Sequence, residues 1–526
     1  MADQDTEMQD AIPCASAIDK TSTKDLGPVL NASMQQLGID GVNRRSVPLP
    51  KGRLEAGGDF GGGTSIVGWG WKEDSTDFVR CGDPEDYLKD GEGEHADRTP
   101  CIAALVSSPL RDDPKHLGMV FGSAARLPAG EDGTLPLKGE MLKLDIVSDS
   151  FVYSQATNCD EMVETIQTAK MVVVGFIRQH SSSQVYIQDP LTNTHKLRTI
   201  RSKSCITREY LRWLLQTLKA AIAIRHNLSF EGVRALFDRH TDVAMSLPSN
   251  STEEDRAAFT KLLNEAGFPI TTWILNEAKS ATLYHVWNQI GDFSGELQFQ
   301  RHLYVLDLGA LTFDAYLVTV TLDAPTLELA GRGKAIGGFS GSQSWNFLFS
   351  RAVEKILKRN ASQMDDLFPD CEDIDEGREA LAAAIQPTKE IFSINNVDDH
   401  YIIKPQLNMD NLDFGEISVK RSEMVVQSDL LQDVSALWSE TMISQVQEHI
   451  EELRATISPT ELPPGARINV GLTGWGSLPP FVLEQFQAKL SNLANVGVER
   501  LETGTNSAVA RGNWLTLMDE KLTRDF

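Results

Sequence analysis

The sequence predicts a mixed α/β protein made of two similar halves with a ligand cleft between them. Each half opens with an Asp-x-Gly turn in a β-rich segment, at Asp59 and at Asp307. Each half then combines strands with amphipathic helices, which is the pattern of a duplicated α/β unit. The 526 residues are also too many for one compact core and fit two lobes of ordinary domain size plus a tail.

The composition is that of a soluble globular protein, with 41% hydrophobic and 23% charged residues. The net charge of −25 argues against a nucleic-acid surface, because nucleic acids are bound by clustered Lys and Arg. No apolar run approaches the roughly 20 residues of a membrane-spanning helix, and the first residues lack the pattern of a signal peptide. Six scattered cysteines without C-x-x-C spacing indicate reduced thiols, in the cytoplasm or the nucleus, and no structural zinc.

Residues 1–48 are polar, acidic and poor in aromatic residues, so we expect a disordered tail. Leu30, Met34 and Leu37 in this tail have helical spacing. This stripe is either a partner-binding helix or a short segment that packs on its own lobe.

The first lobe, residues 49–300, shows strand and helix signals in alternation. Ser251 followed by Glu254 three residues later predicts a capping box at one helix start. The expected elements are a strand at 61–71, a helix at 207–227, a strand at 242–248, a helix from Ser251 and a helix from Ala278.

The second lobe, residues 301–526, repeats this order. We expect a hairpin, a helix at 345–358, a helix at 426–453 and then a strand, a glycine turn and a helix. The acidic stretch 365–376 does not have the spacing of a calcium loop, so we interpret it as a solvated insertion.

The most informative motif is the hairpin 304–320, in which Asp307 precedes a tight turn and Thr312 and Asp314 follow it. Such a turn can present backbone amides and a hydroxyl to a phosphate while the carboxylate holds a hydrated cation. The motif resembles the second phosphate loop of the heat-shock 70 kDa ATPase family. Asp59 and the glycines that follow it, with Thr64 and Ser65, resemble that family's first phosphate loop.

This resemblance covers nearly the whole chain outside the tail, because further motifs follow in the family's order. It implies the two-lobed actin-like ATPase fold, with duplicated ribonuclease-H-like cores and a closing helix that returns to the first lobe. It implies binding of ATP or ADP with Mg²⁺, which Asp59 and Asp307 would hold through water. The catalytic candidates that it implies are Glu277, Asp307, Thr312 and Lys143. The nucleotide-binding candidates are Asp59, Gly61, Gly62, Gly63, Gly309, Asp314, Gly337, Gly338, Lys389, Ser393, Gly474, Trp475, Gly476 and Asn506.

The chain departs from the family at its phosphate loops. Gly62 and Gly63 replace two threonines, and Ala310 and Leu311 replace two glycines. A leucine forced into the dihedral angles of a glycine costs on the order of 1–3 kcal/mol, and its side chain would lie near a γ-phosphate. We therefore expect weak or absent ATP hydrolysis.

Two main hypotheses and a minor one follow. The first is a nucleotide-gated switch that hydrolyses ATP slowly or not at all, and the second is a scaffold that binds no nucleotide. A sugar or small-metabolite kinase ranks last, because no substrate motif is present. The sequence ends shortly after Gly512, so we expect no peptide-binding domain and no chaperone activity, and a protein partner that binds the lobe surfaces or the tail.

Overall fold

The structure is a computed structural model that describes most of the residues expected to form the two halves. Nothing structural is stated below for the others, which include the stripe Leu30–Leu37 and the candidates Gly62, Gly63 and Asn506. The described residues are 52–61, 64–72, 84, 86–88, 99–106, 109–110, 113, 116–125, 138–139, 142–145, 184–290, 298–323, 326–360, 374–395, 400–404, 412–413, 415–420, 423–501 and 507–519.

The first half is built on a sheet in the order β11-β10-β1-β2-β3, with β4 beside β2. The central strand β1 pairs antiparallel with β2 and parallel with β10, and β10 pairs parallel with β11. These strands are β1 (Arg53–Phe60), β2 (Thr64–Lys72), β3 (Asp86–Tyr87), β4 (Thr99–Pro100), β10 (Thr241–Leu247) and β11 (Trp273–Asn276).

The second half has a sheet of the same design, in the order β14-β13-β12-β19-β20. Here β12 pairs antiparallel with β13 and parallel with β19, and β19 pairs parallel with β20. Strand for strand, β12, β13, β14, β19 and β20 repeat the order and direction of β1, β2, β3, β10 and β11. These strands are β12 (Gln298–Leu308), β13 (Phe313–Asp323), β14 (Thr326–Gly338), β19 (Ile468–Thr473) and β20 (Val496–Arg500).

Each half also carries a second, smaller sheet. In the first half its order is β7-β5-β6-β8-β9, and in the second half it is β15-β18-β17-β16. Their strands are β5 (Ala103–Val106), β6 (Leu117–Phe121), β7 (Lys138–Gly139), β8 (Gln184–Asp189), β9 (Thr194–Thr199), β15 (His400–Ile403), β16 (Leu412–Asp413), β17 (Ile417–Lys420) and β18 (Glu423–Gln427).

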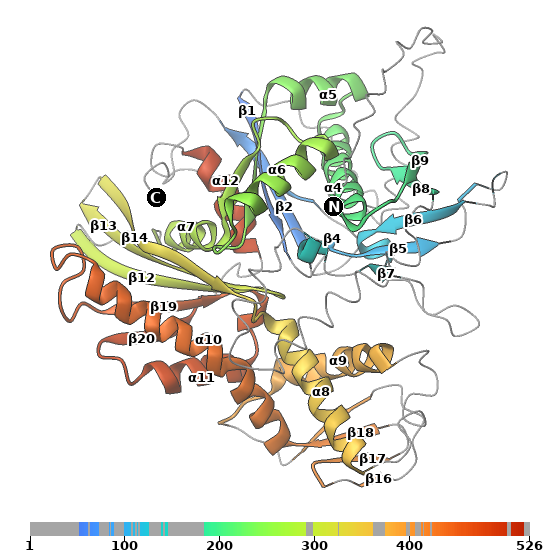
Figure 1. Ribbon diagram of the computed structural model, residues 1–526. Helices are drawn as coiled ribbons and strands as arrows, with labels where there is room; N and C mark the ends of the chain where they lie inside the picture. The colour runs from blue at the N-terminus through green and yellow to red at the C-terminus, as the bar shows by residue number, and fades with distance from the viewer. Residues whose placement is uncertain are drawn as a thin grey trace, which may run out of the picture.

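The helices cover the sheets, and α7 and α12 lie beside the junction of the two halves (Figure 1). Helix α7 contacts β12 and β13 as well as β10 and β11, so it touches both central sheets. The helices are α4 (Lys203–His226), α5 (Phe230–Arg239), α6 (Glu253–Ala266), α7 (Glu277–Ile290), α8 (Ser342–Asn360), α9 (Ile374–Ile391), α10 (Ser428–Thr456), α11 (Pro480–Leu490) and α12 (Ala508–Met518), with short 3₁₀ turns η1 (Gly122–Ala125), η2 (Leu142–Asp145) and η5 (Trp475–Ser477).

Helix α12 comes from the end of the chain and packs on the first half, against β1, β10 and α7. Its Asn513 donates hydrogen bonds to Gly58 O and Ser246 Oγ, at 2.7 and 3.1 Å. A Cβ on Gly512 would lie 1.8 Å from Ser280 O, so this glycine permits the close approach of α12 to α7. The last helix therefore ties the two ends of the described chain together.

Two local predictions are corrected. The capping box of α6 uses Thr252 and Asp255, one residue after the predicted pair Ser251 and Glu254. The strand predicted at 61–71 is β2, which begins three residues later, at Thr64, and the preceding strand β1, Arg53–Phe60, was not predicted. Strand β1 was hard to predict because it contains small residues, including Gly57 and Gly58. These residues let neighbouring segments pack closely but give no hydrophobic pattern in the sequence. No helix in the described part of the chain is long and apolar enough to cross a membrane.

Candidate functional site

The β1–β2 and β12–β13 hairpins place Asp59 and Asp307 near one another. Both carboxylates are partly buried, and the negative charge of Asp59 is felt at Asp307. This interaction agrees with the expected closeness of the two carboxylates, and a cleft between them stays a prediction. Asp314 lies directly opposite Asp307 in the β12–β13 pair and is 1% exposed.

A buried ion pair lies beside these carboxylates. Lys143 Nζ is 2.6 Å from Glu277 Oε1, and the two side chains are 3% and 5% exposed. Lys143 comes from the short turn η2 and Glu277 is the first residue of α7. We call Asp59, Lys143, Glu277, Asp307 and Asp314 the charge cluster.

Burial and mutual repulsion raise the pKa of the aspartates in the charge cluster. Burial, then the negative charge of Glu277, raises the pKa of Asp59 to about 7. Burial, then Asp59 and Glu277, raises the pKa of Asp307 to about 8. The pKa of Asp314 is also raised, by burial and by Glu277. The positive charge of Lys143 lowers all three pKa values. Among the five residues of the charge cluster, this one cation faces four carboxyl groups.

The pKa of Lys143 responds to the same partners. Burial lowers it, but the charges of Glu277 and Asp59 outweigh burial and leave the pKa raised. Lys143 therefore remains an ammonium at neutral pH. Even so, the charge cluster has more acid groups than cations, and it gains stability from either protons or an added cation.

The turn between β12 and β13 contains the substituted residues Ala310 and Leu311. Gly309 N donates to Thr312 O at 2.9 Å, which closes a tight turn. Neither Ala310 nor Leu311 has a positive φ angle, so the turn avoids the strain that would arise if glycine dihedrals were forced. The Leu311 side chain is 3% exposed and the Thr312 side chain 4%.

The carbonyl groups of this turn have hydrogen-bond partners, whereas three of its amides have none among the described residues. The carbonyl oxygens of Gly309, Ala310 and Leu311 each accept a 2.9 Å hydrogen bond from an amide of residues 341–343, at the start of α8. Within the described chain, no group accepts a hydrogen bond from the amides of Ala310, Leu311 or Thr312. Backbone amides need an acceptor, so an oxygen of a ligand or of water can accept hydrogen bonds from these three.

Glycines bring the neighbouring loops against the turn. A Cβ on Gly474 would lie 2.3 Å from Asp307 Oδ1, and one on Gly476 would lie 2.7 Å from Leu308 O. A Cβ on Gly337 would lie 2.7 Å from Asp314 Oδ1. A Cβ on Gly338 would instead meet the ring of Phe313, at 2.4 Å. The predicted glycine loops therefore surround the second hairpin, and η5, which contains Trp475, contacts β12 and α8.

Two predicted nucleotide contacts are engaged within the protein. Lys389 is buried and donates to Ser342 O and, at 3.0 Å, to Asn346 Oδ1. Burial lowers the pKa of Lys389 to about 7. Ser393 Oγ donates to Glu484 Oε1 at 2.6 Å. Both side chains thus form hydrogen bonds to other residues of the protein.

Sequence reasoning missed the residues that join the two halves here. Ser249 N donates to Asp314 Oδ1 at 2.5 Å, and Asn250 Nδ2 donates to Gly337 O. His285 of α7 is 2.8 Å from Thr473 Oγ1 of β19. The available signal was positional: Ser249 and Asn250 follow the carboxyl end of a parallel strand, where ligand sites concentrate.

A direct metal site is not found in the described part of the chain, where no three His, Cys, Asp or Glu side chains are placed to hold one ion. Asp59 and Asp307 were predicted to hold a cation through water. The distance from carboxylate to ion is then longer than in direct coordination, so this prediction is not tested here. The described cysteines, Cys101 and Cys205, are free thiols.

Two family models match the chain. The N-terminal domain of a domain of unknown function (DUF8340) matches residues 54–286, and the domain of unknown function DUF8340 itself matches residues 298–501. The junction of the two matches lies in the segment that leads into β12. No curated protein matches the chain.

Proposed function

We propose that this chain, which belongs to the family with the two DUF8340 domains, binds adenine nucleotide with Mg²⁺ between its two halves. It hydrolyses ATP slowly or not at all and uses the bound nucleotide to control a protein interaction. The observation that carries the proposal is the repeated strand order, which puts an aspartate-bearing hairpin of each half at one charge cluster.

The repeated sheets support the two-lobed actin-like ATPase fold expected from the sequence. In both halves three antiparallel strands continue into two parallel ones, which is the ribonuclease-H-like order implied by the resemblance. A ligand between such halves would lie against the hairpins that carry Asp59 and Asp307.

The charge cluster favours a divalent cation with an anionic ligand. Four carboxyl groups face one lysine, so a phosphate alone would be repelled, whereas hydrated Mg²⁺ would offset the carboxylates. The unpaired amides of Ala310, Leu311 and Thr312 supply donors for phosphate oxygens. When bound, Mg²⁺ would neutralise phosphate charge, and Asp59 and Asp307 would orient its water ligands.

Slow turnover agrees with how the catalytic candidates are engaged. Glu277 contacts the Lys143 ammonium at 2.6 Å, so neither is free to position an attacking water or a transferred phosphate unless the pair opens. Ala310 and Leu311 further alter the turn nearest the γ-phosphate.

The scaffold without nucleotide is the second candidate, and one observation favours it. Lys389 and Ser393, expected at the adenosine, are both occupied by protein acceptors. In either case the protein partner would bind the surfaces of the lobes or the tail, in the cytoplasm or the nucleus.

Calorimetry with ADP and ATP, each with Mg²⁺ or EDTA, tests the proposal. We expect binding that requires Mg²⁺ and an affinity for ADP at least equal to that for ATP. Asp307→Asn should weaken binding at least tenfold, about 1.4 kcal/mol. Asp238→Asn on α5, where the carboxylate is 61% exposed, should have no effect. Absence of binding by wild-type protein would instead support the scaffold.

The variant Ala310→Gly/Leu311→Gly tests the cause of slow turnover. It restores backbone freedom and removes the apolar side chain, so ATP affinity should rise relative to ADP. Hydrolysis should recover only in part, because Gly62 and Gly63 still lack hydroxyl groups. Equal ATP affinity before and after the change would show that the two substitutions are neutral.

A further inference from the structure

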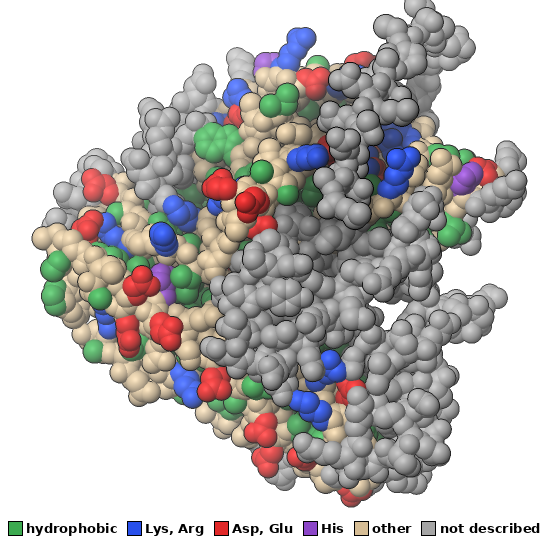
Figure 2. All heavy atoms as spheres, in the orientation of Figure 1, with side chains coloured by type: hydrophobic (Ala, Val, Ile, Leu, Met, Phe, Trp, Pro, Cys, Tyr) green, Lys and Arg blue, Asp and Glu red, His purple; other side chains and the backbone are tan. Residues whose placement is uncertain are grey.

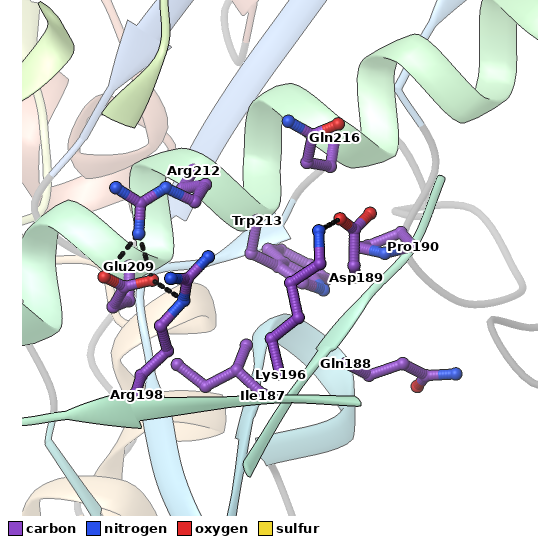
Figure 3. A pocket seen from close by; sticks show the side chains of 10 residues that line it. All are labelled: Ile187, Gln188, Asp189, Pro190, Lys196, Arg198, Glu209, Arg212, Trp213 and Gln216. Carbon is purple, nitrogen blue, oxygen red and sulfur yellow. Dashed lines mark hydrogen bonds and ion pairs between the residues drawn. The ribbon is translucent and has the colours of Figure 1, made fainter. Parts of the chain in front are cut away.

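Lys389 of α9 is a buried cation without a counter-ion, in a protein that is rich in carboxylates. The chain has 74 Asp and Glu residues against 49 Lys and Arg, and side chains of both signs are interspersed on the face drawn in Figure 2. At the junction of α4 with β8 and β9, for example, Arg198 and Arg212 both pair with Glu209 (Figure 3). A carboxylate partner is thus readily available to a cation of this chain, and a lysine without one is informative.

Uncharged acceptors hold the Lys389 side chain. It is 2% exposed, and its Nζ donates to Ser342 O and, at 3.0 Å, to Asn346 Oδ1. Among the described residues no carboxylate forms an ion pair with it. Burial lowers its pKa, and the charge of Glu390 offsets this effect only in part. Burying a cation in this way is costly, so the two hydrogen bonds are the contribution of Lys389 to be explained.

One of the two acceptors belongs to the segment that holds the β12–β13 turn. The amides of residues 341–343, which we call the linking segment, donate to the carbonyl oxygens of Gly309, Ala310 and Leu311, at 2.9 Å each. A helix leaves its first N–H groups without partners inside the helix, and the start of α8 uses them here on the turn. The turn is therefore fixed through its carbonyl groups. Within the described chain, its amides at residues 310–312 donate no hydrogen bond.

Two helices hold the carbonyl groups of the linking segment. Trp438 Nε1 of α10 donates to Gly341 O at 3.2 Å, and Lys389 of α9 donates to Ser342 O. A Cβ on Gly341 would lie 2.3 Å from Ala310 O, so the segment and the turn are in close contact. The linking segment thus connects α9 and α10 to the turn through hydrogen bonds of both its carbonyl and its amide groups.

We propose that Lys389 is a positioning residue for the phosphate-binding turn and not a contact of the adenosine. It fixes Ser342, and the linking segment fixes the carbonyl groups of the turn, so the amides of residues 310–312 stay available to phosphate oxygens. An ammonium donates stronger hydrogen bonds than a neutral group, which suits a fixed support. The effect on phosphate binding rests on the proposed function, whereas the support of the turn needs no ligand.

Hydrogen exchange measured by mass spectrometry, without nucleotide, tests the support of the turn. Lys389→Met keeps most of the side-chain volume and removes the donor. We expect the amides of the linking segment to exchange at least about tenfold faster, while peptides from α4 and β10 in the first half exchange as in wild type. Lys196→Met, whose lysine is 46% exposed, is the matched control and should change neither region.

Two outcomes of the exchange experiment would overturn the proposal. The first is unchanged exchange of the linking segment in Lys389→Met, and the second is faster exchange in every region, which would show a general loss of stability. Asn346→Ala keeps the lysine but removes the acceptor that orients it. It should give a smaller rise in the same amides, and it decides the matter if Lys389→Met does not fold: no rise would refute the support.

Calorimetry with Mg²⁺ and either ADP or adenosine tests the link to phosphate binding. Lys389→Met should weaken ADP binding at least about fivefold, whereas adenosine, which has no phosphate, should bind wild type and variant alike. A loss of adenosine affinity would assign Lys389 to the nucleoside, and an unchanged ADP affinity would separate it from the phosphates; either result would overturn the proposal. If wild-type protein bound no ADP, the proposed function would fail, and the exchange experiment alone would decide whether Lys389 supports the turn.

Discussion

Replacing Lys143 with methionine should destabilise the protein strongly, because it leaves Glu277 as an unpaired buried carboxylate. The pair has a 2.6 Å contact and side-chain exposures of 3% and 5%. Loss of one partner of such a pair costs about 3–5 kcal/mol. Methionine keeps most of the side-chain volume, so the loss reports charge and not a cavity.

Urea denaturation at pH 8 measures this cost. Lys196→Met is the matched control, because the Lys196–Asp189 pair has a similar 2.5 Å contact but the lysine is 46% exposed. Exposed pairs contribute about 0–1 kcal/mol, so the control should change the free energy of unfolding little.

The double variant Lys143→Met/Glu277→Gln separates pairing from packing. It removes both charges, so it should be clearly more stable than Lys143→Met alone. If Lys143→Met cost no more than Lys196→Met, or if the double variant were as unstable as Lys143→Met, the charge cluster would not have the energetics described here.

Three further predictions concern pH, helix packing and capping. Because the folded-state pKa values of Asp59 and Asp307 are raised to about 7 and about 8, the folded state binds more protons than the unfolded state; stability measured in EDTA should fall as pH rises from about 4 to about 8. Asp59→Asn/Asp307→Asn should flatten that dependence, and an equally steep profile in urea titrations would contradict the assigned pKa shifts. Gly512→Ala should lower the free energy of unfolding by about 2 kcal/mol or more through overpacking against α7. The control Gly232→Ala on α5, where the nearest atom to the added Cβ is 3.4 Å away, should be neutral or slightly stabilising. Equal effects of the two variants would mean that α12 does not pack this closely on α7. Thr252→Ala should cost about 1 kcal/mol by removing the cap of α6, and a change within error in thermal or urea unfolding would argue against the capping box.

Local patterns in the sequence were enough for most elements of the fold. The helix predicted at 207–227 is α4 at Lys203–His226, and the strand predicted at 242–248 is β10 at Thr241–Leu247. These elements have strong periodicity, which depends only on neighbouring residues. Strand β1 could not be predicted in this way, because its burial comes from contacts with β2, β10 and α12 and not from a local pattern.

The charge cluster was only partly predictable. Asp59 and Asp307 could be named because each lies beside a tight turn, and the motif is local. That Lys143 would contact Glu277, 134 residues away in sequence, could not be derived from spacing. Ser249 was missed for the same reason, since its role is a backbone donor to Asp314.

The sequence by itself determined the two aspartate turns, the alternation of strands and helices and the substitutions in the phosphate loops, because dihedral preference and hydrophobic period act over a few residues. The tertiary structure alone decided which charges meet. It joined Lys143 to Glu277 and turned Lys389 toward α8. These outcomes depend on packing between distant segments, where burial and neighbouring charge set the protonation and the partners of each side chain.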